Sequence, residues 1–288
     1  MRLDPGSPLR EALAPLVRRA RLVFLSGLPG TGKSLLIRVL AELAHEAGRS
    51  VSLLQWDVAR PVMEGHAAAA AYPARDGVTH GVVRLAVGQW ARGAVARWHA
   101  RHAGSPALLL GETPLAGHRL VELARPADDA AEPLLAAETA RFVIPVPSVA
   151  VRAHLEAERG RRAANPLHPR EREDAPPAVL RDLWRQLAHV GAALGLAPAP
   201  DGAAVPPYDP ALYAAVYRHV LRRRHADVLP IGEILPGAAT RSPYELGVPA
   251  EDLRPEPEEV PALIAAAARA AGSPAALEGV LARWYLTP

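Results

Sequence analysis

The chain has 288 residues, of which 50% are hydrophobic and 22% are charged, and its formal net charge is only +3. The absence of cysteine excludes a disulfide scaffold, a thiolate metal site and a cysteine nucleophile, and no apolar run approaches the roughly 18 residues of a membrane span. An acid and a proline interrupt residues 1–5, where a signal peptide needs a clean apolar stretch, so we expect a cytoplasmic protein with no membrane partner.

The basic residues are almost all arginine. Lys33 is the only lysine, so arginine makes up the other 32 of the 33 basic residues. A coding bias towards alanine, arginine, proline and glycine explains this composition, and it makes the one surviving lysine informative. The small net charge does not by itself indicate a nucleic-acid partner.

The first organised segment is Leu22–Ser26, a continuous apolar run of strand length. Such a run predicts a strand that is buried on both faces, as in a parallel sheet. The glycine-rich residues 27–34 follow it, and a helical pattern then extends as far as Gly48. A second strand is predicted at Val51–Gln55, and Asp57 follows close behind its end.

The alternation of helix and strand continues towards residue 164. A long helix is predicted at 82–102, and a third apolar strand at 106–110 leads into Gly111 and Glu112. The next predicted elements are a helical segment at 117–123, a fourth strand at 142–146 and a helix from Ser148 to about 164. This pattern predicts an α/β fold in which helices cover both faces of an open, mostly parallel sheet.

Residues 165–177 form a proline-flanked, highly charged excursion between two helices. Beyond it we predict a helix at 178–195, a proline-rich connector, a helix beginning at Asp209 and Pro210, a fifth strand at 228–235 and a terminal helical region. The predicted organisation is therefore a core of residues 1–197 and a largely helical C-terminal region of residues 198–288.

Residues 27–34 fit the pattern Gly-x4-Gly-Lys-Ser without a mismatch. Glycines allow backbone N–H groups to curl around phosphate oxygens, while the following helix directs its positive N-terminus at them. In this chemistry Lys33 contacts the β- and γ-phosphates of a nucleotide, and the Ser34 hydroxyl binds Mg²⁺. The only lysine of the chain occupies the position where the motif requires one. The predicted nucleotide-binding residues are Gly27, Leu28, Pro29, Gly30, Thr31, Gly32, Lys33, Ser34 and Leu35.

The class of nucleotide-binding protein follows partly from what is missing. Guanine-specific GTPases use an Asn/Thr-Lys-x-Asp motif, which needs a second lysine, and transport ATPases carry a Leu-Ser-Gly-Gly-Gln signature; the sequence contains neither. With Pro29-Gly30 inside the loop, carboxylates after two strands and an arginine-rich segment, the chain resembles the P-loop kinases related to adenylate kinase and the small-molecule and toxin-type kinases. The resemblance extends over about residues 20–195, and only the loop is highly specific.

The resemblance implies ATP and Mg²⁺ as cofactors and gives two carboxylates a role. Asp57 would contact the acceptor hydroxyl and take its proton, and Arg60 would anchor an anionic group of the substrate. Glu112 would lie on the metal side, together with Ser34. Because a glutamate replaces the commoner aspartate, direct Mg²⁺ ligation and contact through water both remain open. The alternative is that Asp57 and Glu112 merely end strands in solvent.

The resemblance also implies a lid near residues 155–177. Arginines that close over a transferring phosphoryl group screen and position it, and we expect Arg159 and Arg162 to do so. Arg161, Arg170 and Arg172 belong to the same segment. The alternative is a solvated charged helix, since glutamates are interleaved with these arginines.

These features predict an ATP-dependent kinase that phosphorylates a hydroxyl group of an unidentified small molecule. Two alternatives remain open: a nucleotide-dependent switch or adaptor that binds a partner through the region after Ala197, and an RNA-directed kinase that uses Arg222–Arg224. No aromatic stacking platform accompanies that basic run, which disfavours a nucleic-acid partner.

Overall fold

The computed structural model describes residues 6–75, 77–202, 204–234 and 242–286. Six parallel strands form one sheet in the order β5–β4–β1–β3–β2–β6. The prediction of an α/β fold with a parallel sheet is therefore confirmed. The strands are β1 (Leu22–Ser26), β2 (Val51–Gln55), β3 (Leu108–Thr113), β4 (Ala140–Pro147), β5 (Ala226–Ile231) and β6 (Glu251–Asp252).

Strand β1 lies between β3 and β4, and all five of its residues are buried. Successive side chains of a strand point to opposite faces of the sheet. Accordingly, Leu22 and Phe24 join the hydrophobic core on one face, while Val23 and Leu25 join the core on the other. The unbroken apolar run in the sequence thus reflects a sheet that is covered on both sides.

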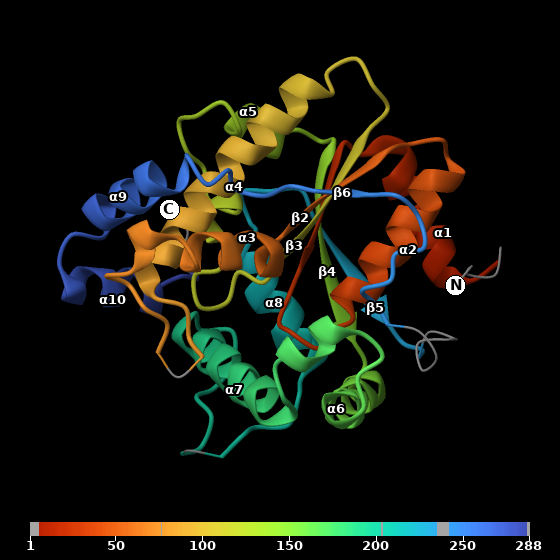
Figure 1. Cartoon of the computed structure of the whole chain (residues 1–288). Helices are drawn as coiled ribbons and strands as arrows, with labels where there is room; N and C mark the ends of the chain where they lie inside the picture. The colour runs from red at the N-terminus through yellow and green to blue at the C-terminus, as the bar shows by residue number, and fades with distance from the viewer. Residues whose placement is uncertain (1–5, 76, 203, 235–241, 287–288) are drawn as a thin grey trace.

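Helices provide both covers, as Figure 1 shows. They are α1 (Pro8–Arg19), α2 (Lys33–Glu46), α3 (Trp56–Glu64), α4 (Gly81–Arg101), α5 (Glu132–Leu135), α6 (Val149–Ala164), α7 (Pro177–Ala193), α8 (Pro210–Val220), α9 (Val260–Ala271) and α10 (Pro274–Ala282). α1 and α2 pack on the face of the sheet that holds Val23 and Leu25, whereas α4, α7 and α8 pack on the opposite face. α9 and α10 pack against α4.

The segment after β3 differs from its prediction. Residues 117–123, predicted to be helical, form turns followed by a single 3-10 turn at Val121–Leu123. Leu115, His118 and Leu120 adopt left-handed backbone conformations, with φ of 59°, 63° and 61°. Such conformations interrupt the hydrogen bonds of an α-helix, and residues other than glycine rarely adopt them. The helical prediction for this segment is therefore wrong.

Several boundaries also differ. β3 continues beyond the predicted end and includes Gly111 and Glu112, so Glu112 lies within a strand. β5 begins at Ala226 and ends at Ile231, short of the predicted 235, which lies outside the described residues. Three helices, α1, α3 and the short α5, and the short strand β6 were not predicted.

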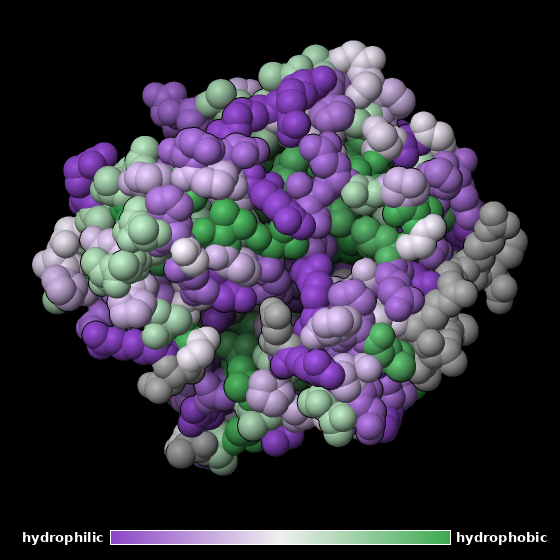
Figure 2. All heavy atoms as spheres, viewed as in Figure 1, coloured by the Kyte–Doolittle hydropathy of each residue, from purple (hydrophilic) through white to green (hydrophobic). Residues whose placement is uncertain are grey.

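The C-terminal region completes the sheet. Its strands β5 and β6 pair with β4 and β2 and form the two edges, while α8 packs in the same core as the first half of the chain. Within the described residues, no single helix has the length and apolar character that crossing a membrane requires, although the bent pair α9 and α10 meets the criterion jointly. Hydrophilic residues dominate the face seen in Figure 2, and hydrophobic ones are visible in smaller groups.

Candidate functional site

A cavity of about 760 Å³, which we call the central cavity, opens where β1, β2 and β3 end. After β1 the chain adds β2 and β3 on one side of that strand and then β4 on its other side, so the strand order reverses at β1. Ligands of open α/β sheets bind at such points. Its volume is in the range of small-molecule sites. Among the predicted site residues, Pro29, Gly30, Thr31, Gly32, Lys33, Ser34, Leu35, Asp57, Arg60, Glu112, Arg159 and Arg162 line it, whereas Gly27 and Leu28 do not.

Residues 27–34, the glycine loop, connect β1 to α2. Gly30 and Gly32 have φ of +74° and +83°, conformations that strain any other residue. The loop is tied from behind, because the N–H of Leu28 donates a hydrogen bond to the hydroxyl of Tyr213 in α8 at 3.1 Å. α2 begins at Lys33 without a side-chain cap. The backbone N–H groups of its first turn therefore remain for water or an anion to satisfy.

Lys33 lies at the base of the central cavity, with only 3% of its side chain exposed. Its ammonium donates to the carbonyl of Leu28 at 2.7 Å and lies 3.2 Å from Oε1 of Glu112. Burial lowers the pKa of Lys33, while the charge of Glu112 opposes that change. A compact cation is thus held beside the loop by one carbonyl and one carboxylate.

Ser34 and Glu112, the residues expected on the metal side, both line the central cavity. Among the described residues, no group of three or more histidine, aspartate or glutamate side chains is arranged to hold a metal ion. Mg²⁺ commonly takes one or two protein oxygens and completes its shell with water and substrate phosphates. One hydroxyl and one carboxylate beside a glycine loop would fit a Mg²⁺ ion that arrives with a nucleotide, and they do not fit an all-protein metal cage.

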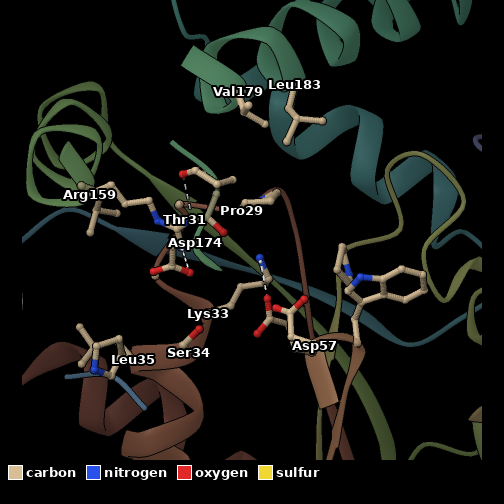
Figure 3. A pocket seen from close by; sticks show the side chains of 18 of the residues that line it. Pro29, Thr31, Lys33, Ser34, Leu35, Asp57, Arg159, Asp174, Val179 and Leu183 are labelled. Carbon is tan, nitrogen blue, oxygen red and sulfur yellow. Dashed lines mark hydrogen bonds and ion pairs between the residues drawn. The ribbon is translucent and has the colours of Figure 1, made fainter. Parts of the chain in front are cut away.

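Asp57 is the second residue of α3, directly behind the end of β2. Solvent reaches its carboxylate through the mouth of the central cavity, yet the protein around it desolvates the group. This desolvation and the nearby charge of Glu112 raise the pKa of Asp57, against the opposing charges of Arg60, Arg170 and Lys33. A raised pKa makes a carboxylate a better proton acceptor. Figure 3 shows Lys33 and Asp57 projecting into the same space.

The arginines of residues 155–177 differ in whether they line the central cavity or face solvent. Arg159 and Arg162 line the central cavity, and both have carboxylate partners. Nη2 of Arg159 lies 3.2 Å from Oδ1 of Asp174, and Nη1 of Arg162 lies 2.8 Å from Oε1 of Glu171; Figure 3 shows Arg159 beside Asp174. Arg161 is 60% exposed and pairs with Glu158 on the same helix. The interpretation as a solvated charged helix therefore fits Arg161, whereas Arg159 and Arg162 face the site.

Several cavity-lining residues were not among the predicted site residues. Asp174 accepts a hydrogen bond from the hydroxyl of Tyr244 at 2.6 Å, and burial raises the pKa of Asp174 despite the charge of Arg159. Arg84 comes from α4 and Arg119 from the loop after β3, and both line the central cavity. Neither belongs to a local motif, so no signal in the sequence could have brought them together.

The basic run at the end of α8 does not form a continuous basic surface. The side chain of Arg224 is 1% exposed, donates to the carbonyl of Leu123 and lies 2.7 Å from Glu132. It therefore links the end of α8 to the segment before β4. The RNA-directed alternative loses one of its three arginines to this structural role.

Comparisons of the chain with protein-family models, with curated proteins and with solved structures found no match. The resemblance stated above consequently depends on the glycine loop. What the protein does is inferred below from the chemistry of the central cavity.

Proposed function

We propose that the chain is an ATP-dependent P-loop kinase that transfers the γ-phosphoryl group of ATP to a hydroxyl group of a small molecule. The observation that carries the proposal is the convergence of Lys33, Glu112 and Asp57 in one cavity, beside a glycine loop that opens a helix. Lys33 begins the helix that follows β1, Asp57 lies in the helix that follows β2, and Glu112 lies in β3, which is between these two strands in the sheet. Together they supply a cation for phosphates, a carboxylate for the metal and a carboxylate for a hydroxyl proton.

The glycine loop and α2 would bind the triphosphate. Backbone N–H groups of the loop would surround the β-phosphate, and Lys33 would exchange its present contacts with Leu28 and Glu112 for β- and γ-phosphate oxygens. Glu112 would then be available on the metal side. Ser34 and Glu112 would hold Mg²⁺, which neutralises charge on the phosphates when it is bound.

The transfer step follows from the position of Asp57. The acceptor hydroxyl donates its proton to the Asp57 carboxylate, and its oxygen forms the new bond to the γ-phosphorus. The bond from that phosphorus to the bridging oxygen breaks, and ADP leaves with the electron pair. Asp57 later returns the proton to solvent. Its raised pKa supports this role, because a more basic carboxylate accepts the proton more readily.

Residues 155–177 would act as the lid. Arg159 and Arg162 line the central cavity, and their present partners, Asp174 and Glu171, belong to the same segment. Binding of ATP would offer these arginines phosphate oxygens in place of carboxylates. Their planar, always-charged groups suit the charge that spreads over the transferring phosphoryl group.

The test measures ADP formation by the purified protein with Mg·ATP and pools of hydroxylated small molecules. We expect ADP to form only when an acceptor is present, and Lys33→Ala to abolish it. Arg101→Gln is the control, because Arg101 is 55% exposed at the far end of α4 and pairs with Glu251 on the surface. ADP formation that no small molecule changes, and that persists in Lys33→Ala, would contradict the proposal.

A further inference from the structure

Two arginines converge over one glycine in the central cavity. A Cβ atom built on Gly117 would lie 3.3 Å from Nη1 of Arg119 and 3.5 Å from Nη1 of Arg84. Gly117 itself has a φ of +66°. A side chain at this position would be strained and would occupy the space between the two guanidinium groups. The glycine thus leaves a small recess lined by two cations.

Among the described residues neither arginine forms an ion pair with a carboxylate, although Glu64 acts electrostatically on Arg84 and Asp57 on Arg119. Arg84 donates to the carbonyls of Thr79 at 2.8 Å and Gly117 at 2.7 Å, and Arg119 donates to the carbonyl of Ala116 at 3.2 Å. The other arginines around the cavity differ in this respect. Arg60 pairs with Glu64, Arg159 with Asp174, and Arg162 with Glu171.

Burial makes this arrangement costly for an empty site. Arg84 is only 9% exposed, and burial together with the charge of Arg119 lowers its pKa to about 10, while the charge of Glu64 opposes the change. Burial also lowers the pKa of Arg119, while the charge of Asp57 opposes the change. Buried charges are normally paired, because desolvation without a partner is unfavourable. Glu64 and Asp57 act on these arginines without forming an ion pair in the described structure, and an anionic ligand would supply that direct counter-charge.

The loop that presents Arg119 is held in a strained shape. Leu115, His118 and Leu120 around it are left-handed, and the backbones of Leu115 and Arg119 are paired at 2.9 and 3.2 Å. His118 is fully buried, and its Nε2 lies 2.8 Å from Oε1 of Glu122. Backbone strain of this kind persists where the surrounding structure fixes it, and it is concentrated at ligand sites.

We propose that Arg84 and Arg119 bind an anionic group of the phosphoryl acceptor, so that the acceptor carries both a hydroxyl group and a phosphate or a carboxylate. That the anion belongs to the acceptor rests on the proposed function, whereas the anion site itself does not. Asp57 and Arg119 are close enough to interact electrostatically, so the hydroxyl and the anion lie in the same half of the cavity. Arg60, the anchor expected from the sequence, is already paired with Glu64.

The test measures anion binding and needs no catalysis. Inorganic phosphate and acetate are titrated separately, by calorimetry at constant ionic strength, into the protein saturated with Mg·ADP so that the glycine loop is occupied. The variants are Arg84→Gln and Arg119→Gln, with Arg101→Gln as the control on the same helix as Arg84. We expect each cavity variant to weaken binding of the preferred anion at least about tenfold, and the control to bind like the wild type.

A stronger response to phosphate assigns a phosphorylated acceptor, and a stronger response to acetate assigns a carboxylate. If the wild type binds neither anion, or a folded cavity variant binds as tightly as the wild type, the site is overturned. Arg119→Gln decides the question should the more deeply buried Arg84→Gln not fold. If the protein binds an anion but has no kinase activity, the anion site is supported and its assignment to a phosphoryl acceptor is refuted. If the protein phosphorylates only neutral acceptors, the proposed function is supported and an anionic acceptor is refuted.

Discussion

The two halves of the central cavity are built in different ways. The half around the glycine loop, which we propose binds the nucleotide and call the donor half, is nearly continuous in the sequence, and its cation Lys33 is held by Leu28 and Glu112. The half that we propose binds the acceptor, the acceptor half, is assembled from α3, α4 and the loop after β3. Its two central arginines donate hydrogen bonds to backbone carbonyls and form no ion pair in the described structure. A triphosphate is a constant ligand that one compact motif can bind, whereas an acceptor requires residues gathered from distant segments.

Replacing Lys33 tests the donor half and should have the largest effect. Lys33→Ala removes the cation that would bridge the β- and γ-phosphates, so we expect acceptor-dependent ADP formation to fall about 10³-fold. Lys33→Arg should restore little of it, because the broad guanidinium does not fit the site of a compact ammonium. Steady-state rates of both variants measure this. Turnover near the wild-type rate in Lys33→Ala would show that the glycine loop does not bind the nucleotide as proposed.

Asp57→Asn separates the two halves of the cavity. The amide cannot accept the hydroxyl proton, so transfer should fall about 10²-fold, while the dissociation constant of Mg·ATP should change little because Asp57 lies outside the glycine loop. Fluorescent nucleotide titration and transfer rates measure the two quantities. Full turnover in the variant would exclude Asp57 as the base.

The arginine segment offers a matched pair of neighbours. Arg159 lines the central cavity, and Arg161 is 60% exposed on the outside of the same helix. Arg159→Gln should lower kcat about tenfold or more, because it removes a cation from the developing charge, and Arg161→Gln should leave kcat within about twofold. Equal effects of the two substitutions would mean that this segment does not act as a lid.

A pair of tyrosines tests how the glycine loop is supported. Tyr213→Phe leaves the N–H of Leu28 without its partner, so we expect a loss of about 1–3 kcal/mol of unfolding free energy and a several-fold higher KM for ATP. The hydroxyl of Tyr208, in the same aromatic cluster, is buried without a hydrogen-bond partner among the described residues. Tyr208→Phe should therefore be neutral or slightly stabilising in chemical denaturation. The reverse order of stabilities would contradict the role of Tyr213.

The smallest expected effect is a dependence of stability on pH. The folded-state pKa of Asp57 is raised above the ordinary value of 3.8, so the folded protein favours the protonated form and loses stability as pH rises through that pKa. Asp57→Asn should consequently raise the thermal midpoint slightly at pH 7 and not below the ordinary pKa. Thermal melts of the wild type and of Asp57→Asn, from below the ordinary pKa up to pH 7, measure the difference between their midpoints. A lower midpoint at pH 7 would show that the carboxylate stabilises the fold.

Local signals in the sequence were sufficient to place the glycine loop between a strand and a helix and to predict much of the sheet. Leu22–Ser26 and Val51–Gln55 form strands within the predicted bounds, because short apolar runs between turns are a local signal. α3 was not predicted because Pro61 lies inside the helix and because the helix begins directly after the end of β2. Proline normally disfavours a helix interior.

The acceptor half could not be predicted, for a different physical reason. Its geometry depends on left-handed backbone conformations at Leu115, His118 and Leu120. Leucine and histidine give no sequence signal for such a conformation. All three side chains are fully buried, so packing against the rest of the protein, which a local signal does not reveal, surrounds them. The pairing of Asp174 with Tyr244 likewise joins segments 70 residues apart.

The fate of the γ-phosphoryl group tests the central claim most directly. The purified protein is incubated with Mg·ATP labelled at the γ-phosphate and with hydroxylated small molecules that do or do not carry a phosphate or a carboxylate. The account predicts that the label appears in a new phosphate ester of an acceptor, and that Asp57→Asn largely abolishes this product. Label released only as inorganic phosphate, at a rate that no small molecule changes, would contradict it and favour the nucleotide-dependent switch.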